Sequence, residues 1–188
     1  HGTFRSSSRL CNIHYYIYTP ELPKAVIMLS HGMCEYIERY TEFARFLCDS
    51  DIALIGCDHL GHGNSIENDD MLGYFGHRRG HIHMAQDLHR MKMITEQRFP
   101  DIPHFLIGHS MGSFAAREYL TWYGDDISAC VLVGTSDGFD NRKALVLFTK
   151  LMCLYEGGRY HLPFILKIGS FLFNNKMGRM SIGWDWLS

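Results

Sequence analysis

Residues 108–112, Gly-His-Ser-Met-Gly, limit the choice of fold more than any other stretch of the sequence, and they have the pattern G-x-S-x-G. An apolar run of strand type, residues 103–107, precedes them, and residues 113–120 form a helix-forming segment with apolar residues at helical spacing. A strand, a sharp turn and a helix are the context in which this pattern presents a nucleophilic serine. The sequence therefore predicts a nucleophile elbow with Ser110 at its tip.

The residues beside Ser110 suit a tight turn. Gly108 and Gly112 allow the strand and the helix to approach closely, and the start of the helix points free N–H groups at a reacting carbonyl. His109 is not expected to be the catalytic base, because adjacent residues on a strand point to opposite faces. We predict that it packs or forms a hydrogen bond beneath the elbow. The alternative interpretation of the motif is a glycine-flanked surface turn.

A second turn fits the same chemistry. In acyl transfer at such an elbow, one donor to the oxyanion is the N–H of the residue after the nucleophile, and the other comes from the loop after an earlier strand. Met111 follows Ser110, and Met33 follows His31 and Gly32 at the end of an apolar run. We predict that the backbone N–H groups of Met33 and Met111 form an oxyanion hole, with Gly32 letting the chain bend. The alternative is a plain strand-to-loop turn.

Strand-like and helix-like segments alternate along the chain. Continuous apolar runs predict strands over residues 25–29, 52–57, 103–109 and 128–134, and helical apolar spacing predicts helices over residues 37–49, 81–98 and 111–123. This alternation predicts an α/β fold with a mostly parallel sheet and helices on both faces. Residues 4–18 indicate an N-terminal hairpin, with Ile13, Tyr15 and Ile17 on one buried face.

We assign residues 1–136 to this core and residues 137–188 to the beginning of a helical cap. The alternation does not resume after the last predicted strand, so we expect the sheet to be truncated before its last core strands and to end in an exposed apolar edge. The apolar cap residues fit an acyl-chain pocket and an ordinary cap core equally well: Phe148, Leu151, Phe164, Leu166 and Phe171.

Composition excludes several classes of function. The 188 residues carry a net charge of −2 without a basic stripe, which argues against a nucleic-acid partner, and no apolar run approaches the 18 residues of a membrane span. Six cysteines lie far apart, which favours a reducing, cytoplasmic location. The best metal candidate, His81-x-His83 with Asp87 and His89, is weak because residues two apart on a helix point to nearly opposite faces. We predict neither a metal nor a cofactor.

Three motifs carry a resemblance to a known family. Residues 30–35 (Ser-His-Gly-Met-Cys-Glu) and 38–40 (Glu-Arg-Tyr) resemble the HGxxE…RY segment of monoacylglycerol lipases and lysophospholipases, which belong to the serine aminopeptidase-like group of α/β-hydrolases. Residues 58–65 resemble that family's D-x-R-G-H-G-x-S loop, but Leu60 replaces the usual Arg and removes a cation. The elbow is similar to the family's LxGHSMGG, with Ser113 where Gly is common.

The resemblance covers about residues 10–137 and implies a catalytic triad whose acid and base follow Ser110 in the chain. Asp137, Asp140 and Asp185 are poor candidates for the acid, and His161 is a poor candidate for the base, because we find no further strand after residue 134 for them to follow. By resemblance, about a third of a complete enzyme is absent, so we expect the acid and the base beyond residue 188.

Two functions remain open at this point. The resemblance implies a serine hydrolase of lipid metabolism that cleaves carboxylic esters of single-chain lipids through an acyl-enzyme on Ser110, as a monoacylglycerol lipase or a lysophospholipase does. A peptidase is a variant within that class. The other function is a non-catalytic binding protein with the same fold, since fold alone does not fix function. The expected partner is a small ester or a monoacyl lipid; transient contact with a lipid surface is compatible with it, and the oligomeric state is left open.

Overall fold

The computed structural model describes residues 1–137 and residue 150. The chain divides into two compact units, His1–Asp137 and Gly138–Ser188, and the description concerns the first. The predicted cap residues lie outside the described residues, and so do His161, Asp140 and Asp185. The assignment of residues 137–188 to a cap therefore stays a prediction.

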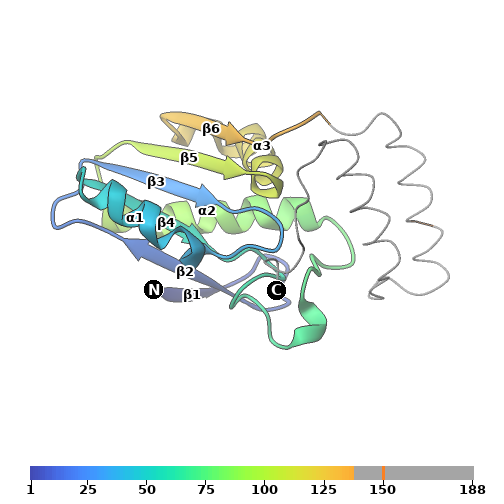
Figure 1. The fold of residues 1–188 in the computed structure, drawn as a ribbon. Helices are drawn as coiled ribbons and strands as arrows, with labels where there is room; N and C mark the ends of the chain where they lie inside the picture. Colours follow the sequence, from blue (N-terminus) through green and yellow to red (C-terminus); the bar gives the residue numbers. More distant parts are fainter. Residues whose placement is uncertain (138–149, 151–188) are drawn as a thin grey trace, which may run out of the picture. The chain divides into compact units, whose positions relative to one another are not determined.

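A six-stranded sheet forms the centre of the first unit, in the order β1-β2-β4-β3-β5-β6 (Figure 1). The strands are β1 (Gly2–Arg5), β2 (Asn12–Tyr18), β3 (Ala25–Ser30), β4 (Ile52–Cys57), β5 (His104–His109) and β6 (Ala129–Val133). The hairpin β1–β2 is antiparallel and joins β4 antiparallel, whereas β4, β3, β5 and β6 run parallel. The predicted mostly parallel sheet with an N-terminal hairpin is confirmed.

Helices cover both faces of the sheet, as the alternation predicts (Figure 1). They are α1 (Thr41–Cys48), α2 (Gly80–Arg98) and α3 (Met111–Tyr123), with short 3₁₀ turns η1 (Ile37–Tyr40), η2 (Asp69–Met71) and η3 (Gly124–Asp126). The first turn of the predicted 37–49 helix is thus 3₁₀. Phe43 follows the same helical apolar spacing as Ala44 and Leu47, but it is 36% exposed because Ala44 and Leu47 face the sheet. None of the helices within residues 1–137 has the length and apolar content needed to cross a bilayer.

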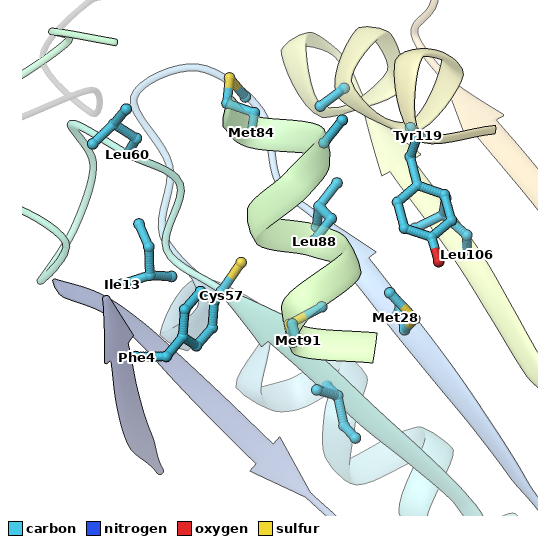
Figure 2. Close-up of a cluster of buried hydrophobic side chains, with 14 of the residues drawn as sticks. Phe4, Ile13, Met28, Cys57, Leu60, Met84, Leu88, Met91, Leu106 and Tyr119 are labelled. Atoms are coloured by element: carbon cyan, nitrogen blue, oxygen red, sulfur yellow. The ribbon is translucent and has the colours of Figure 1, made fainter. Parts of the chain in front are cut away.

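The larger core lies between the sheet and the helices α2 and α3. Met84, Leu88 and Met91 project from α2, and Figure 2 shows them with Met28 of β3 and Tyr119 of α3. All five are less than 7% exposed, and burying such a side chain stabilises the fold by about 1.5–3 kcal/mol. This layer packs α2 and α3 on the face of the sheet that contains β3 and β5.

The predicted face of β2 packs on the core, with Ile13 fully buried, but the opposite face is covered as well. Tyr15 and Ile17 pack against the larger core, but Tyr16 and Tyr18 pack against the smaller core beneath α1. The reason is that β2 pairs with β4 inside the sheet, where both faces are covered. A period-two pattern identifies a strand but does not say what covers its second face.

Candidate active site

Ser110 occupies the sharp turn between β5, which ends at His109, and α3, which begins at Met111. Its backbone angles, φ 50° and ψ −117°, lie outside the regions that a non-glycine residue ordinarily adopts, at a cost of about 1–3 kcal/mol. Hydrogen bonds fix this conformation. The Ser110 N–H donates to Val133 O (2.8 Å), and the Ser110 carbonyl accepts from the N–H (2.9 Å) and the hydroxyl (2.6 Å) of Ser113.

Two glycines let the elbow pack closely. A Cβ atom on Gly108 would lie 2.8 Å from Ala116 Cβ, within α3. A Cβ atom on Gly112 would overlap Ser30 O and lie 2.5 Å from His31 O. The start of α3 therefore rests on the backbone at the end of β3. Because β3 and β5 pair in parallel, with Ser30 opposite Gly108, the elbow and the second predicted turn lie at neighbouring strand ends.

That second turn, residues 31–34, leaves β3 with His31 and Gly32 buried and the Met33 side chain 60% exposed. Cys34 adopts the left-handed region, with φ 58°. The Met111 amide opens α3, so its N–H is among those without a partner inside the helix. The structure thus places the backbone of Met33 and of Met111 just after two adjacent strand ends. Their role as oxyanion donors stays a prediction.

One carboxylate oxygen, Glu35 Oε2, joins this turn to the elbow. It accepts hydrogen bonds from the Gly32 N–H (2.7 Å) and from the Tyr40 hydroxyl (2.6 Å), and it lies 3.2 Å from His109 Nδ1. Tyr40 Oη also lies 3.1 Å from His109 Nδ1. Burial would raise the pKa of Glu35, but the hydrogen bonds from Tyr40 and Gly32, with His109, outweigh it and hold this pKa below its ordinary value. Glu35 therefore remains a charged acceptor at neutral pH.

His109, the last residue of β5, has hydrogen-bond partners outside the elbow. Its Nδ1 faces Glu35 and Tyr40, and its side chain is 38% exposed. Within residues 1–137, the hydrogen bonds of Ser110 are the backbone ones described above. The described part of the chain thus pairs no histidine with the Ser110 hydroxyl.

A second network supports the elbow from below. Ser30 Oγ donates to Gly112 O (3.0 Å), so its contact with His59 Nε2 (2.9 Å) must be one in which the imidazole donates. His31 Nε2 accepts from the His59 N–H (2.9 Å), and His31 Nδ1 donates to Gly32 O (2.7 Å). These bonds fix His31 as the neutral tautomer with its proton on Nδ1, and they place a proton on His59 Nε2. Burial is also the main cause that lowers the pKa of His31, to about 4, and that of His59 well below its ordinary value.

The loop of residues 58–65 is held by Asp58, whose carboxylate accepts from the backbone N–H of Ile37 (2.8 Å) and of Asn64 (2.8 Å). Leu60, which stands where the family has Arg, is 1% exposed and belongs to the larger core. An apolar side chain of the core therefore occupies the position at which that family has a cation.

Two histidines of α2, His83 and His89, form contacts with other elements. Asp87 accepts from Ser6 Oγ (2.7 Å) and from the Ser7 N–H (2.7 Å), which anchors the hairpin turn to α2. His83 contacts Ser7, whereas His89 stacks on Tyr123 with ring centroids 3.8 Å apart. Within residues 1–137, no group of three His, Cys, Asp or Glu side chains is arranged to hold a metal ion.

The family model for serine aminopeptidase, S33, matches residues 21–156, about seven tenths of the chain. This chain belongs to the serine aminopeptidase S33 family. Its fold is the α/β-hydrolase fold: a thermostable carboxyl esterase from Bacillus coagulans, solved in complex with glycerol, superposes with a TM-score of 0.81 at 28% identity over 98% of this chain and 60% of the esterase. Monoglyceride lipase from Saccharomyces cerevisiae shares the fold, with a TM-score of 0.64 at 19% identity over 80% of this chain and 51% of the lipase.

Two curated relatives of this S33 chain are named for one activity. Homo sapiens monoglyceride lipase is 36% identical over 94 residues, which are 50% of this chain and 29% of the lipase. Monoacylglycerol lipase from Mycolicibacterium smegmatis is 30% identical over 127 residues, which are 65% of this chain and 42% of the lipase. The chain therefore spans less than half the length of either relative.

Sequence reasoning did not assign roles to Glu35, Tyr40, Ser30 and His59, although all four contribute to the two networks. The signal for the first two was present, because both lie within the HGxxE…RY segment of the S33 family. No local signal indicated that Glu35 would meet His109, which is 74 residues away along the chain.

The two buried imidazoles predict an acid-sensitive fold. Below pH 6.5 an unfolded chain protonates His31, while the folded chain resists until about pH 4, so stability falls as the pH is lowered through this window. A shift of this size corresponds to about 3 kcal/mol. Urea unfolding at pH 7 and pH 4.5 measures it for the wild type and for His31→Asn.

The expected result is a shallower loss of stability towards acid in His31→Asn than in the wild type. The buried carboxyls Asp58 and Asp87, whose pKa values burial raises, act in the opposite direction but are common to both proteins and cancel in the comparison. His77→Asn, at an exposed position, is the matched control and should follow the wild type. Parallel pH dependences for His31→Asn and the wild type would contradict the prediction.

Proposed function

We propose that this S33 chain is part of a serine hydrolase that cleaves carboxylic esters of single-chain lipids, as a monoacylglycerol lipase or a lysophospholipase does. The observation that carries the proposal is the strained Ser110 between β5 and α3, held beside the turn at the end of β3. A serine in such a turn stands clear of the sheet and can meet a carbonyl carbon. The monoglyceride lipase relatives support the substrate class.

In the proposed reaction, Ser110 Oγ attacks the ester carbonyl carbon and loses its proton to a base. The carbonyl π electrons move onto oxygen, where the N–H groups of Met33 and Met111 stabilise the oxyanion; losing one such donor costs about 3–4 kcal/mol in comparable sites. The C–O bond to the alcohol then breaks, the alcohol takes up a proton, and water releases the carboxylic acid from Ser110. The residues that act as base and acid are left unassigned.

A substrate panel tests the proposal with the full-length protein that carries this sequence. We expect kcat/KM for a monoacylglycerol or a lysophospholipid to exceed that for a triacylglycerol or an aminoacyl amide by roughly ten- to a hundredfold. A preference for aminoacyl amides would make the protein a peptidase. Absence of turnover on the whole panel, together with ligand binding, would instead support the non-catalytic binding protein.

A covalent probe tests the nucleophile separately. A fluorophosphonate should modify the protein at one serine, and peptide mass spectrometry should find the adduct on Ser110. An adduct on another serine would contradict the assignment, whatever the substrate panel gives.

A further inference from the structure

We infer that Glu35 is a positioning residue for ester hydrolysis: its carboxylate fixes the turn that carries Gly32 and Met33 and ties it to the strand end before Ser110. The inference rests on the proposed function, because the turn matters to catalysis only if Met33 donates to an oxyanion. Glu35 would then contribute to catalysis without touching the substrate, by fixing the backbone of the turn.

Glu35 contacts the turn through the backbone of Gly32. Glu35 Oε2 accepts the Gly32 N–H at 2.7 Å, which closes a turn of four residues, and Met33 supplies the next amide along the chain. A hydrogen bond to an ionised carboxylate is roughly twice as strong as one between neutral groups. The Gly32 N–H, and with it the orientation of the following peptide, is therefore held by the strongest type of acceptor that a side chain offers.

Glu35 also contacts the strand end before the elbow, through Tyr40 and His109. Tyr40 donates its only hydroxyl hydrogen to Glu35 Oε2 at 2.6 Å, so its oxygen is an acceptor for His109 Nδ1 at 3.1 Å. His109 Nδ1 thus donates towards Tyr40 and Glu35, and this holds the ring of the residue that precedes Ser110. One oxygen atom therefore joins the turn of residues 31–34 and the η1 turn to the end of β5, where His109 lies 74 residues from Glu35 along the chain.

Little space separates Gly32, Glu35 and His109. The Glu35 side chain is 14% exposed, and a Cβ atom on Gly32 would lie 2.9 Å from Glu35 Oε2 and 3.1 Å from His109 Nδ1. The turn therefore cannot move towards the elbow while Glu35 is in place. Removal of the carboxylate opens this space and leaves the Gly32 N–H and the Tyr40 hydroxyl without their acceptor.

The consequence should appear in the chemical step more than in substrate binding. A donor displaced by about 1 Å can cost around a hundredfold in rate, and an oxyanion exists only after attack. We expect Glu35→Ala to lower kcat about a hundredfold and to change KM less than about threefold. Glu35→Gln keeps a neutral acceptor and Tyr40→Phe removes one donor, so each should lower kcat about tenfold.

The test is steady-state kinetics of the full-length protein on a short-chain nitrophenyl ester. Glu42→Ala, at an exposed carboxylate on α1, is the matched control and should retain the wild-type kcat. A second readout is hydrogen exchange of the Gly32 amide by NMR, which should be protected in the wild type and in Glu42→Ala, and at least about tenfold faster in Glu35→Ala.

The outcomes separate the inference from the proposed function. If Ser110→Ala is inactive but Glu35→Ala keeps kcat within about threefold, the function stands and the inference is wrong. If the wild type hydrolyses no ester, the proposed function is wrong, and so is the catalytic role of Glu35. The hydrogen-exchange rate of the Gly32 amide then decides whether the Glu35 carboxylate fixes the turn. If Glu35→Ala does not fold, the kcat of Glu35→Gln and Tyr40→Phe decides, and wild-type values in both overturn the inference.

Discussion

Substitution of Ser110 by alanine is expected to abolish ester hydrolysis and fluorophosphonate labelling by the full-length protein. The proposed acyl-enzyme forms on the Ser110 hydroxyl, which alanine lacks. The backbone of residue 110, with φ 50° and ψ −117°, is as strained for alanine as for serine, so the substitution brings no structural gain. In serine proteases, removal of triad members lowers the rate about 10⁴- to 10⁶-fold. We expect a loss of at least about 10⁴-fold in kcat.

Ser50→Ala, at an exposed position after α1, is the matched control and should keep full activity and labelling. Circular dichroism and thermal unfolding of both variants would show whether the fold is retained. Residual turnover of Ser110→Ala above about a hundredth of the wild-type rate would contradict the assignment of the nucleophile.

Replacement of Gly112 by alanine is expected to damage both stability and activity. The new methyl group would overlap Ser30 O and approach His31 O, and these are backbone atoms at the end of β3 and in the turn after it, which cannot rotate away as a side chain can. Overpacking of this kind costs about 1–3 kcal/mol. Because α3 must shift away from β3, Ser110 also moves relative to Met33, and a displacement of about 1 Å lowers kcat about a hundredfold.

Gly124→Ala is the matched control for this substitution. Gly124 closes α3 at φ −64°, and a Cβ atom there meets Leu120 at 3.9 Å, an ordinary van der Waals distance. Urea unfolding and ester kinetics of the two variants give the comparison. If both variants behave alike, close packing of α3 on the end of β3 is not what positions the elbow.

Local sequence determined the elements of this fold. The apolar runs that predict strands over residues 52–57 and 103–109 match β4 (Ile52–Cys57) and β5 (His104–His109), and helical spacing predicts α3 over its full length. These signals are local because each element shows its burial along its own sequence, as a period of two or 3.6 residues. The position of Ser110 between a strand and a helix follows from the same signals.

Burial on a particular face was harder to predict. Phe43 is exposed although it lies on the expected apolar stripe, and Tyr16 and Tyr18 are partly buried although they alternate with Ile17. The spacing of apolar residues says that an element has a buried side. It does not say how wide the covering layer is, since that depends on which helix packs there.

The sequence by itself determined the strand–turn–helix that presents Ser110, the second turn after β3, and the family to which the chain is similar. Only the tertiary structure decided that Glu35 meets His109 across 74 residues, that Ser30 supports the first turn of α3 across 82 residues, and which nitrogen of His59 carries the proton. The physical reason is the register of β3 on β5, with Ser30 opposite Gly108. Register is set by the packing of whole strands between two helical layers, and no local spacing of residues encodes it.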